Sequence, residues 1–221
     1  KCDLADDACT KSWRKYYEEQ GYYTALVNAR DGQGVRAVND VVMKACKEKI
    51  ERDRKRGILN RPVRAMIVGI PNVGKSTFIN SFAKKACTRT GDRPGVTKGK
   101  QWIRLNKNVE LLDTPGILWP KFEDQQIGLK LAFIGSIKDE ILQVTELCVK
   151  LIDVLKATYP GLLLTYLGYE ISDDSYELLK QYAVKRGCKL KGDEPDIEKA
   201  AILFLDVYRG GKIGRITLET V

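Results

Sequence analysis

Gly69-Ile-Pro-Asn-Val-Gly-Lys-Ser76 is the stretch of sequence that decides the fold. It fits the pattern G-x-x-x-x-G-K-[ST], and it lies between an apolar run at residues 63–70 and a helical pattern at residues 75–85. In this context consecutive backbone N–H groups curl round a phosphate, and the helix N-terminus adds partial positive charge. The sequence therefore predicts a phosphate-binding loop made by Asn72, Val73, Gly74, Lys75, Ser76 and Thr77.

A second motif, Asp113-Thr-Pro-Gly116, follows another apolar strand at residues 109–112. An Asp at the end of a neighbouring strand can hold Mg²⁺ through water, and the Gly116 N–H can bond a γ-phosphate and sense its loss. Between the two motifs, Thr97 in an irregular basic segment offers another hydroxyl. Each feature alone is an ordinary turn or loop residue, but in this order they predict a magnesium site at Ser76, Thr97 and Asp113.

A third element stands at the start of the chain, where Lys1-Cys-Asp3 is similar to the tail of N-K-x-D, the motif that reads guanine in GTPases. A carboxylate there accepts hydrogen bonds from the guanine N1–H and 2-amino groups, a pair that adenine lacks, and the Lys stem covers one face of the base. Asn28-Ala29, after a β-rich run at residues 22–27, matches a turn that offers a backbone N–H to guanine O6. Alone, K-x-D is common and the turn is equally well a strand end. The predicted guanine-binding residues are Lys1, Asp3, Asn28 and Ala29.

The order of these elements is unusual, because the guanine-reading residues precede the phosphate loop. In this order and over essentially all its length, the chain resembles the RbgA/YlqF family of circularly permuted GTPases that assemble the large ribosomal subunit. The resemblance implies further elements before Lys1, including a first strand and the Asn of N-K-x-D, so we expect that part of the domain to be missing. The matching stretches are Gly69-Ile-Pro-Asn-Val-Gly-Lys-Ser-Thr77, Thr90-Gly-Asp-Arg-Pro-Gly-Val-Thr97, Leu111-Leu-Asp-Thr-Pro-Gly-Ile-Leu-Trp-Pro-Lys-Phe-Glu-Asp124 and Lys185-Arg-Gly-Cys188.

The resemblance implies an enzyme that converts GTP to GDP and phosphate, with GTP or GDP and Mg²⁺ as its ligands. It also implies that the GTP state binds the precursor of the large ribosomal subunit, through ribosomal RNA and ribosomal proteins, and that hydrolysis releases it. Hydrolysis is expected to be slow alone and stimulated by the particle. Two other classes stay open: a signalling-type GTPase switch with a protein effector, and an ATP-using P-loop enzyme such as a kinase.

The residue after Gly116 is Ile117, where many small GTPases carry a Gln that orients the attacking water. An isoleucine cannot orient water, so the sequence leaves the catalytic group unidentified. It comes either from another part of the protein or the ribosome, or from a potassium ion beside the phosphates. GTPases that use potassium carry an Asn at the position of Asn72, which is therefore a candidate K⁺ ligand; the alternative is that Asn72 only shapes the loop.

Composition and charge suit a soluble globular protein of one large domain or two small ones. The chain has 221 residues and a net charge of +9; residues 1–122 hold 25 basic and 13 acidic residues, a net +12, whereas residues 123–221 carry a net −3. Without histidine, a Ser-His-Asp or Cys-His catalytic set and a histidine-ligated metal are excluded. Six Cys without a C-x-x-C pair and the absence of a leader or a long apolar run predict a cytoplasmic protein with reduced thiols and no membrane association, and we expect a monomer.

The pattern of elements predicts an α/β domain at 1–122, with a mostly parallel sheet and helices on both faces, followed by an all-helical C-terminal domain at 123–221 that docks on the ribosome or its RNA. Basic runs at residues 47–56 and 185–191 are either solvated helix surface or contacts to a phosphate backbone. The predicted helices lie at residues 8–20, 35–56, 75–85, 126–135, 140–157, 173–186 and 196–209. The predicted strands lie at residues 22–27, 63–70, 101–105, 109–112 and 213–218.

Overall fold

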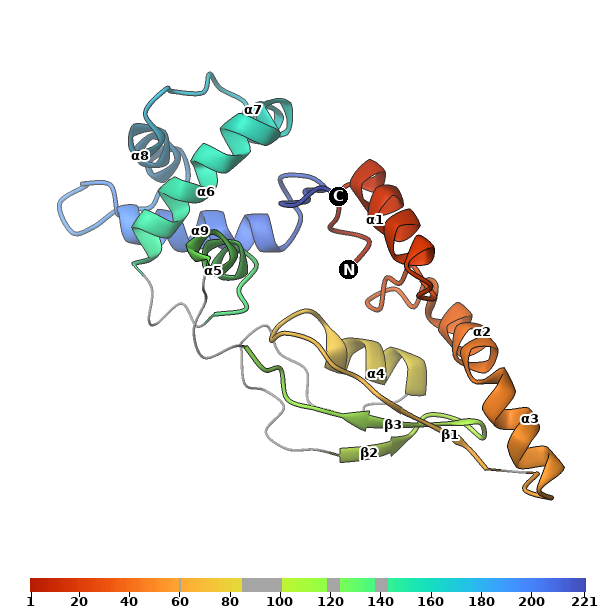
Figure 1. Ribbon diagram of the computed structural model, residues 1–221. Helices are drawn as coiled ribbons and strands as arrows, with labels where there is room; N and C mark the ends of the chain where they lie inside the picture. The colour runs from red at the N-terminus through yellow and green to blue at the C-terminus, as the bar shows by residue number, and fades with distance from the viewer. Residues whose placement is uncertain (60, 85–100, 119–123, 138–142) are drawn as a thin grey trace. The chain divides into compact units, whose positions relative to one another are not determined.

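The computed structural model describes residues 1–59, 61–84, 101–118, 124–137 and 143–221 (Figure 1). The chain divides into two compact units, Lys1–Pro120 with Glu219–Val221, and Lys121–Leu218. Thr97 and the irregular segment around it lie outside the described residues.

The first unit is built on a three-stranded sheet, in the order β1-β3-β2. β1 (Val63–Met66) runs parallel to β3 (Val109–Asp113), and β2 (Gln101–Arg104) runs antiparallel to it. The prediction of a mostly parallel sheet is therefore wrong for the described strands, where one pair is parallel and the other antiparallel. The reason is that β2 and β3 are joined by a short turn, and only antiparallel strands can be joined so closely. The predicted hairpin itself is confirmed.

The helices of the first unit follow the expected pattern with one exception, and one predicted strand of this unit does not form. The single helix expected at residues 35–56 is two helices that meet at Cys46, whose φ and ψ of −101° and 11° interrupt the helix. The β-rich run at residues 22–27 is not a strand; among the described residues it has no strand partner, and Tyr22, Tyr23 and Leu26 are exposed. The helices are α1 (Asp7–Glu19), α2 (Val35–Ala45), α3 (Lys47–Lys55) and α4 (Lys75–Ala83).

Burial alternates along β3, and this alternation fixes the direction of its last residue. Val109, Leu111 and Asp113 are buried, because side chains at every second position of a strand point to the same face. The first two join Ile79 of α4 and Ile103 of β2 in one apolar cluster. The side chain of Asp113, at the end of the strand, therefore points inward. This is unusual, because a carboxylate at the end of a strand ordinarily faces solvent.

The second unit is a bundle of helices around one large apolar cluster that includes Leu151, Leu155, Leu179 and Phe204. The sequence pattern did not predict α7, whose eight residues begin with Pro160 at the first helical position and read as a short apolar run. The strand expected at residues 213–218 does not form; Ile213, Ile216 and Leu218 pack against the cluster instead. The helices are α5 (Gln125–Phe133), α6 (Val144–Thr158), α7 (Pro160–Leu167), α8 (Ser175–Lys185) and α9 (Ile197–Arg209).

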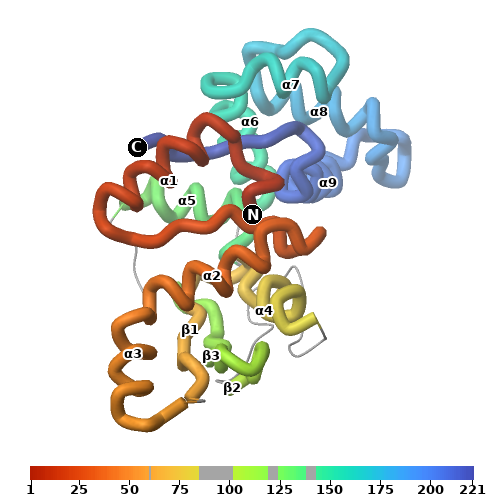
Figure 2. Tube along the Cα trace, turned by 90° about the vertical axis from the view of Figure 1, so that its right-hand side faces the viewer, coloured from red at the N-terminus to blue at the C-terminus, as the bar shows by residue number. Residues whose placement is uncertain are grey.

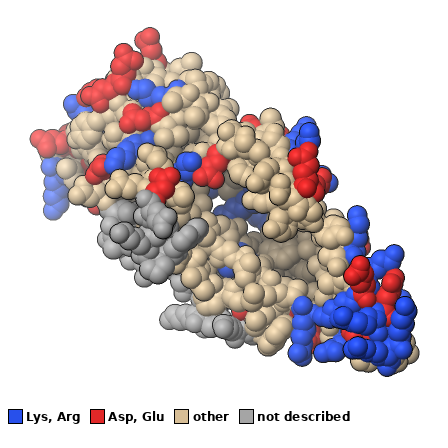
Figure 3. Space-filling view, viewed as in Figure 1, with Lys and Arg blue, Asp and Glu red and all other residues tan. Residues whose placement is uncertain are grey.

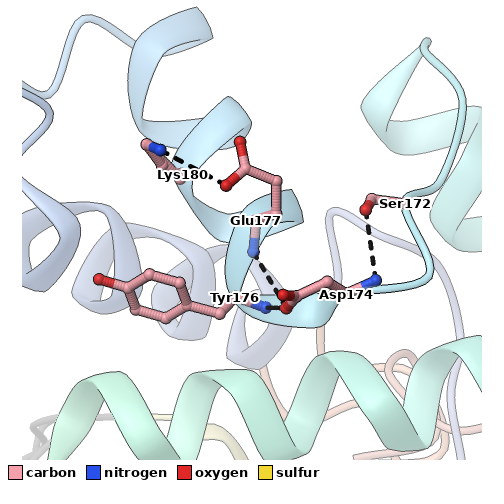
Figure 4. A network of polar contacts seen from close by, with 5 residues as sticks. All are labelled: Ser172, Asp174, Tyr176, Glu177 and Lys180. Carbon is pink, nitrogen blue, oxygen red and sulfur yellow. Dashed lines mark hydrogen bonds and ion pairs between the residues drawn. The ribbon is translucent and has the colours of Figure 1, made fainter.

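Carboxylate caps start three of these helices, and Figure 4 shows the one on α8. The Asp174 carboxylate accepts hydrogen bonds from the N–H groups of Tyr176 at 2.8 Å and Glu177 at 3.3 Å. A cap of this kind stabilises a helix by about 1 kcal/mol. At the other end of α5, the Arg209 guanidinium donates to two terminal carbonyls, those of Phe133 at 2.9 Å and Ala132 at 2.8 Å. In the described part of the chain, every helix is too short or too polar to cross a membrane.

One glycine of the first unit is fixed by contact with another segment. Gly34 has a φ of +75°, and a Cβ atom added there would lie 1.9 Å from the backbone oxygen of Leu26. Gly57 has a similar φ of +80° and nothing within 4 Å of such an atom. Both glycines have a left-handed backbone that strains any other residue, but only Gly34 is in close contact with another segment. Comparing substitutions at the two positions therefore distinguishes the two effects.

We expect Gly34→Ala to destabilise the first unit by about 3 kcal/mol more than Gly57→Ala, whose own cost is about 1 kcal/mol of left-handed strain. Urea unfolding followed by tryptophan fluorescence reports on this unit, because Trp13, Trp102 and Trp119 all belong to it. Equal unfolding midpoints for the two variants would show that the Leu26 contact carries no weight.

Candidate nucleotide-binding site

The loop between β1 and α4 has the backbone of a phosphate cradle (Figure 1). Asn72 and Gly74 have φ angles of 60° and 95°, so the chain turns sharply twice within three residues before α4 begins at Lys75. Left-handed residues of this kind turn successive N–H groups toward a common centre. Asn72 is the unusual member, since few residues other than glycine adopt this conformation.

The Lys75 ammonium is held across this loop. It donates hydrogen bonds to the backbone oxygens of Gly69 at 2.9 Å and Ile70 at 2.8 Å. Partial burial lowers the pKa of Lys75, and the charge of Asp113 opposes that shift. A cation with two of its three protons engaged by the loop keeps one donor for an anion.

Asp113 is the buried carboxylate that faces this cation. It is 1% exposed, and its Oδ1 atom is buried with no hydrogen-bond partner in the described residues. Burial raises the pKa of Asp113, while Lys75 and the N–H of Thr114 pull that pKa down by a smaller amount. A buried carboxylate oxygen without a donor fits a hard cation such as Mg²⁺, which prefers oxygen ligands. Within the described residues no cluster of three or more acidic, Cys or His side chains offers a different metal site.

Gly116 brings the second motif against the first. A Cβ atom at this position would lie 2.6 Å from both the N and Cα atoms of Pro71, and 3.0 Å from the Lys75 Nζ atom. Only glycine allows the backbone to approach this closely. The Thr114 hydroxyl, which donates to the Ile67 backbone oxygen at 2.7 Å, holds the same segment against the end of β1.

Pro71 and Thr114 are positioning residues that sequence analysis missed. Both lie inside the two motifs, but only the tertiary contacts show what they do. Ile117, just beyond Gly116, is 73% exposed. Its side chain makes no part of the apolar cluster, so burial does not explain an isoleucine here.

The start of the chain lies beside the phosphate loop. The Lys1 Cε atom is 3.6 Å from the place of a Cβ atom on Gly74, so the apolar stem of Lys1 covers the loop. The Cys2 N–H donates to the Val27 backbone oxygen at 3.4 Å, which joins the segment of Lys1 and Asp3 to the turn that follows residue 27. Three segments far apart in sequence thus meet at one place.

The Asn28 side chain organises its own turn. Its Oδ1 accepts from the N–H groups of Arg30 at 3.1 Å and Asp31 at 3.4 Å, and its Nδ2 donates to the Asp31 carboxylate at 2.8 Å. The side chain is therefore engaged by the turn, and the Asn28 N–H donates to the Gln33 backbone oxygen at 3.0 Å. Of these two residues, the Ala29 N–H is the backbone donor left to contact a base. Asp3 is half-buried and makes no hydrogen bond or ion pair with any described residue.

Comparison with known proteins places these features in a family. The family model described as "50S ribosome-binding GTPase" matches residues 64–178. Ribosome biogenesis GTPase A of Bacillus cereus is 47% identical over 221 residues, which is all of this chain and 75% of that protein. Ribosome biogenesis GTPase A of Thermotoga maritima is 32% identical over 219 residues, 99% of this chain and 73% of that protein.

Two solved structures of YlqF share the fold. One is described as GDP-bound and the other as GNP-bound, from T. maritima; their TM-scores are 0.67 and 0.69. Each is 29% identical to this chain and covers all of it, and the chain covers 80% and 78% of them. Because the similarity spans the whole chain, it reflects common descent of the entire sequence and more than a shared loop motif.

The buried charge of Asp113 leads to a prediction about pH. The folded-state pKa lies above the usual value near 3.8, so the unfolded chain gives up this proton at lower pH than the folded chain. The free energy of unfolding therefore falls as pH rises through this interval and stays lower at neutral pH. In metal-free and nucleotide-free protein, Asp113→Asn should gain stability relative to the wild type as pH rises from about 4 to 7.

Urea unfolding across this pH range is the measurement, with Asp40→Asn, an exposed carboxylate on α2, as the control. The same Asp113→Asn protein should lose Mg²⁺-dependent nucleotide affinity. A stability difference that shrinks toward neutral pH would contradict the assignment of Asp113 as a charge held for a ligand.

Proposed function

Because the chain belongs to the ribosome biogenesis GTPase A family of GTP hydrolases, we propose that it binds and hydrolyses GTP while assembling the large ribosomal subunit. The contact that carries the proposal is the approach of Gly116 to Pro71 and Lys75. It joins a γ-phosphate sensor to a phosphate loop at the place where the Oδ1 atom of Asp113 is left without a donor. Hydrolysis of GTP removes the γ-phosphate, and with it the contact that holds the Gly116 segment in one state.

We propose that the nucleotide lies across three segments, in circularly permuted order along the chain. Asn72 to Thr77 and Gly116 surround the phosphates, while the Lys1 stem and the Asp3 carboxylate take the base with the backbone at Asn28 and Ala29. The position of Lys1 over Gly74 supports this arrangement, because it places the guanine-reading segment one side chain away from the phosphate loop.

We further propose that Mg²⁺ is held by Ser76, Thr97 and Asp113. When bound, the ion neutralises charge that develops on the phosphates during transfer. The orphaned Oδ1 atom of Asp113 supports this site. For Asn72 two roles stay open, a K⁺ ligand and a loop-shaping residue, and its left-handed φ of 60° favours neither exclusively.

The partner we propose is the precursor of the large ribosomal subunit, with its RNA and proteins. Ile117 is exposed and apolar, so the free protein has no water-orienting group at that position, and in this proposal docking on the particle completes the site. In this proposal residues 123–221 form a docking domain, and a monomeric cytoplasmic protein binds the particle in its GTP state and leaves after hydrolysis. The alternative, a signalling switch with a protein effector, would need an activator other than the particle.

Asp3→Asn tests the base. The change turns one of the two acceptors into a donor, so affinity for GTP should fall by about 1.5–3 kcal/mol, roughly 10- to 100-fold, and affinity for xanthosine triphosphate should rise. Competition binding with labelled nucleotide measures both, with Asp40→Asn as the control. Equal affinity of the wild-type protein for ATP and GTP would show that Asp3 does not read guanine.

Asn72→Ala tests the monovalent ion. If Asn72 binds K⁺, hydrolysis should be faster in K⁺ than in Na⁺ at constant ionic strength, and the variant should lose that difference while it keeps most of its nucleotide affinity. No preference for K⁺ in the wild type would leave Asn72 with the loop-shaping role alone.

Turnover of GTP with and without purified large subunits tests the partner. We expect stimulation of at least about tenfold, and tighter sedimentation with particles in a GTP analogue than in GDP. By linkage, the particle must tighten GTP binding by the same factor as GTP tightens particle binding. Turnover that particles do not change, with equal sedimentation in both nucleotides, would make the signalling switch the better account.

A further inference from the structure

Helix α3, together with Lys44 in the last turn of α2 and Arg56 just after α3, carries a dense group of exposed cations. Between residues 44 and 56 there are seven basic and three acidic residues, and all seven basic side chains are exposed. Figure 3 shows Lys and Arg gathered over this helix at the lower right of the molecule. None of the residues of α3 is buried. The exposed cations are Lys44, Lys47, Lys49, Arg52, Arg54, Lys55 and Arg56.

Stability does not account for these charges. A helix without an apolar face is usually held by ion pairs one turn apart, but α3 has a single such pair, Lys47 with Glu51 at 4.0 Å. In the part of the chain that the structure describes, Lys49, Arg52, Arg54, Lys55 and Arg56 form no ion pair. Like charges so close together repel one another, and the helix tolerates that cost without a gain in packing.

The other basic run of the sequence is engaged by its own unit. Lys185 donates to the Leu167 backbone oxygen at 2.8 Å and lies 4.4 Å from the Tyr169 ring centroid. Arg186 donates to the Tyr166 hydroxyl at 2.6 Å and stacks on the Tyr182 ring at 5.3 Å. These cations fix α8 to α7, so the run at 185–191 is partly a structural clamp, in contrast to α3.

Helix α3 precedes β1, at the end of this strand that lies opposite the phosphate loop. The Val63 N–H, at the start of β1, donates to the Asn108 backbone oxygen at 2.7 Å, and the Asn106 amide donates to Asn39 of α2 at 3.3 Å. Figure 2 shows the chain turning after α3 and entering β1 at this end, whereas the phosphate loop leaves β1 at the other. A ligand on α3 therefore leaves the nucleotide site open.

We propose that α3 is an RNA-binding surface, on which the side chains of Lys49, Arg52, Lys55 and Arg56 contact the phosphate backbone. Arginine and lysine in excess over acid, on an exposed helix, match the charge of a nucleic acid. A membrane surface fits less well, because a helix that lies on lipid inserts an apolar face and α3 offers Ile50 alone. The inference rests on the proposed function, since it names how the protein holds ribosomal RNA.

The test compares two variants with the same change of charge in the full chain. The first replaces Lys49, Arg52, Lys55 and Arg56 with Gln. The control replaces four exposed cations of the first unit that lie outside α3 with Gln, namely Lys11, Lys15, Arg36 and Lys107. Filter binding of a short labelled RNA hairpin between about 50 and 200 mM salt gives the affinity and its salt dependence.

We expect the α3 variant to bind RNA about tenfold more weakly, with a slope of log K against log salt smaller by about 2–3, and the control to change much less. Equal losses in the two variants, or none in either, would overturn the proposal. Binding to vesicles that contain phosphatidylserine is measured for the same proteins. A loss of vesicle binding in the α3 variant without a loss of RNA binding would also overturn the proposal. Particle-free GTP turnover should be the same in all three proteins. If the proposed function is wrong, ribosomal particles will not stimulate GTP turnover in any of the three proteins. The salt dependence of RNA binding still tests the role of α3 in that case.

Discussion

The parallel pairing of β1 with β3 is the constraint on which the candidate site depends. The pairing continues one residue past β1, where the Ile67 N–H donates to the Leu112 backbone oxygen at 3.0 Å. The segments that follow β1 and β3 therefore leave the sheet side by side. The segment after β1 then forms the phosphate loop, and the end of β3 with the segment after it carries Asp113 and Gly116. The Thr114 hydroxyl and the contact of Gly116 with Pro71 hold the two departing segments together.

This pairing brings a carboxylate and an ammonium into a partly buried place, where the loss of hydration disfavours the charged form of each group. Burial raises the pKa of Asp113 and lowers the pKa of Lys75, and their mutual attraction only partly offsets either shift. A structure selected for stability alone would fill this place with apolar side chains. The unmet hydrogen-bonding capacity of the Asp113 Oδ1 atom is the observation that supports the proposed Mg²⁺ site.

The sequence predicted most of the elements that depend on local pattern, although not α7 or the break at Cys46, and it missed the contacts that depend on tertiary partners. The strand, loop and helix around Lys75 and the hairpin before Asp113 follow from motifs and turn residues, and the structure has them. Residues 22–27 have strand composition, but among the described residues no strand edge lies beside them, so composition misled. The roles of Pro71 and Thr114, and the clamp formed by Lys185, arise from contacts that no short window of sequence contains.

The central claim is that the segment beginning at Lys1 and the phosphate loop form one guanine nucleotide site. Titration of ¹⁵N-labelled protein with GDP and Mg²⁺, followed by amide chemical shifts, tests it directly. The account predicts that amides of Asp3, Ala29 and Gly74 shift together with a single dissociation constant, and that ADP does not reproduce the shifts at Asp3 and Ala29. Shifts confined to the phosphate loop, or the same shifts at all three with ADP, would contradict it.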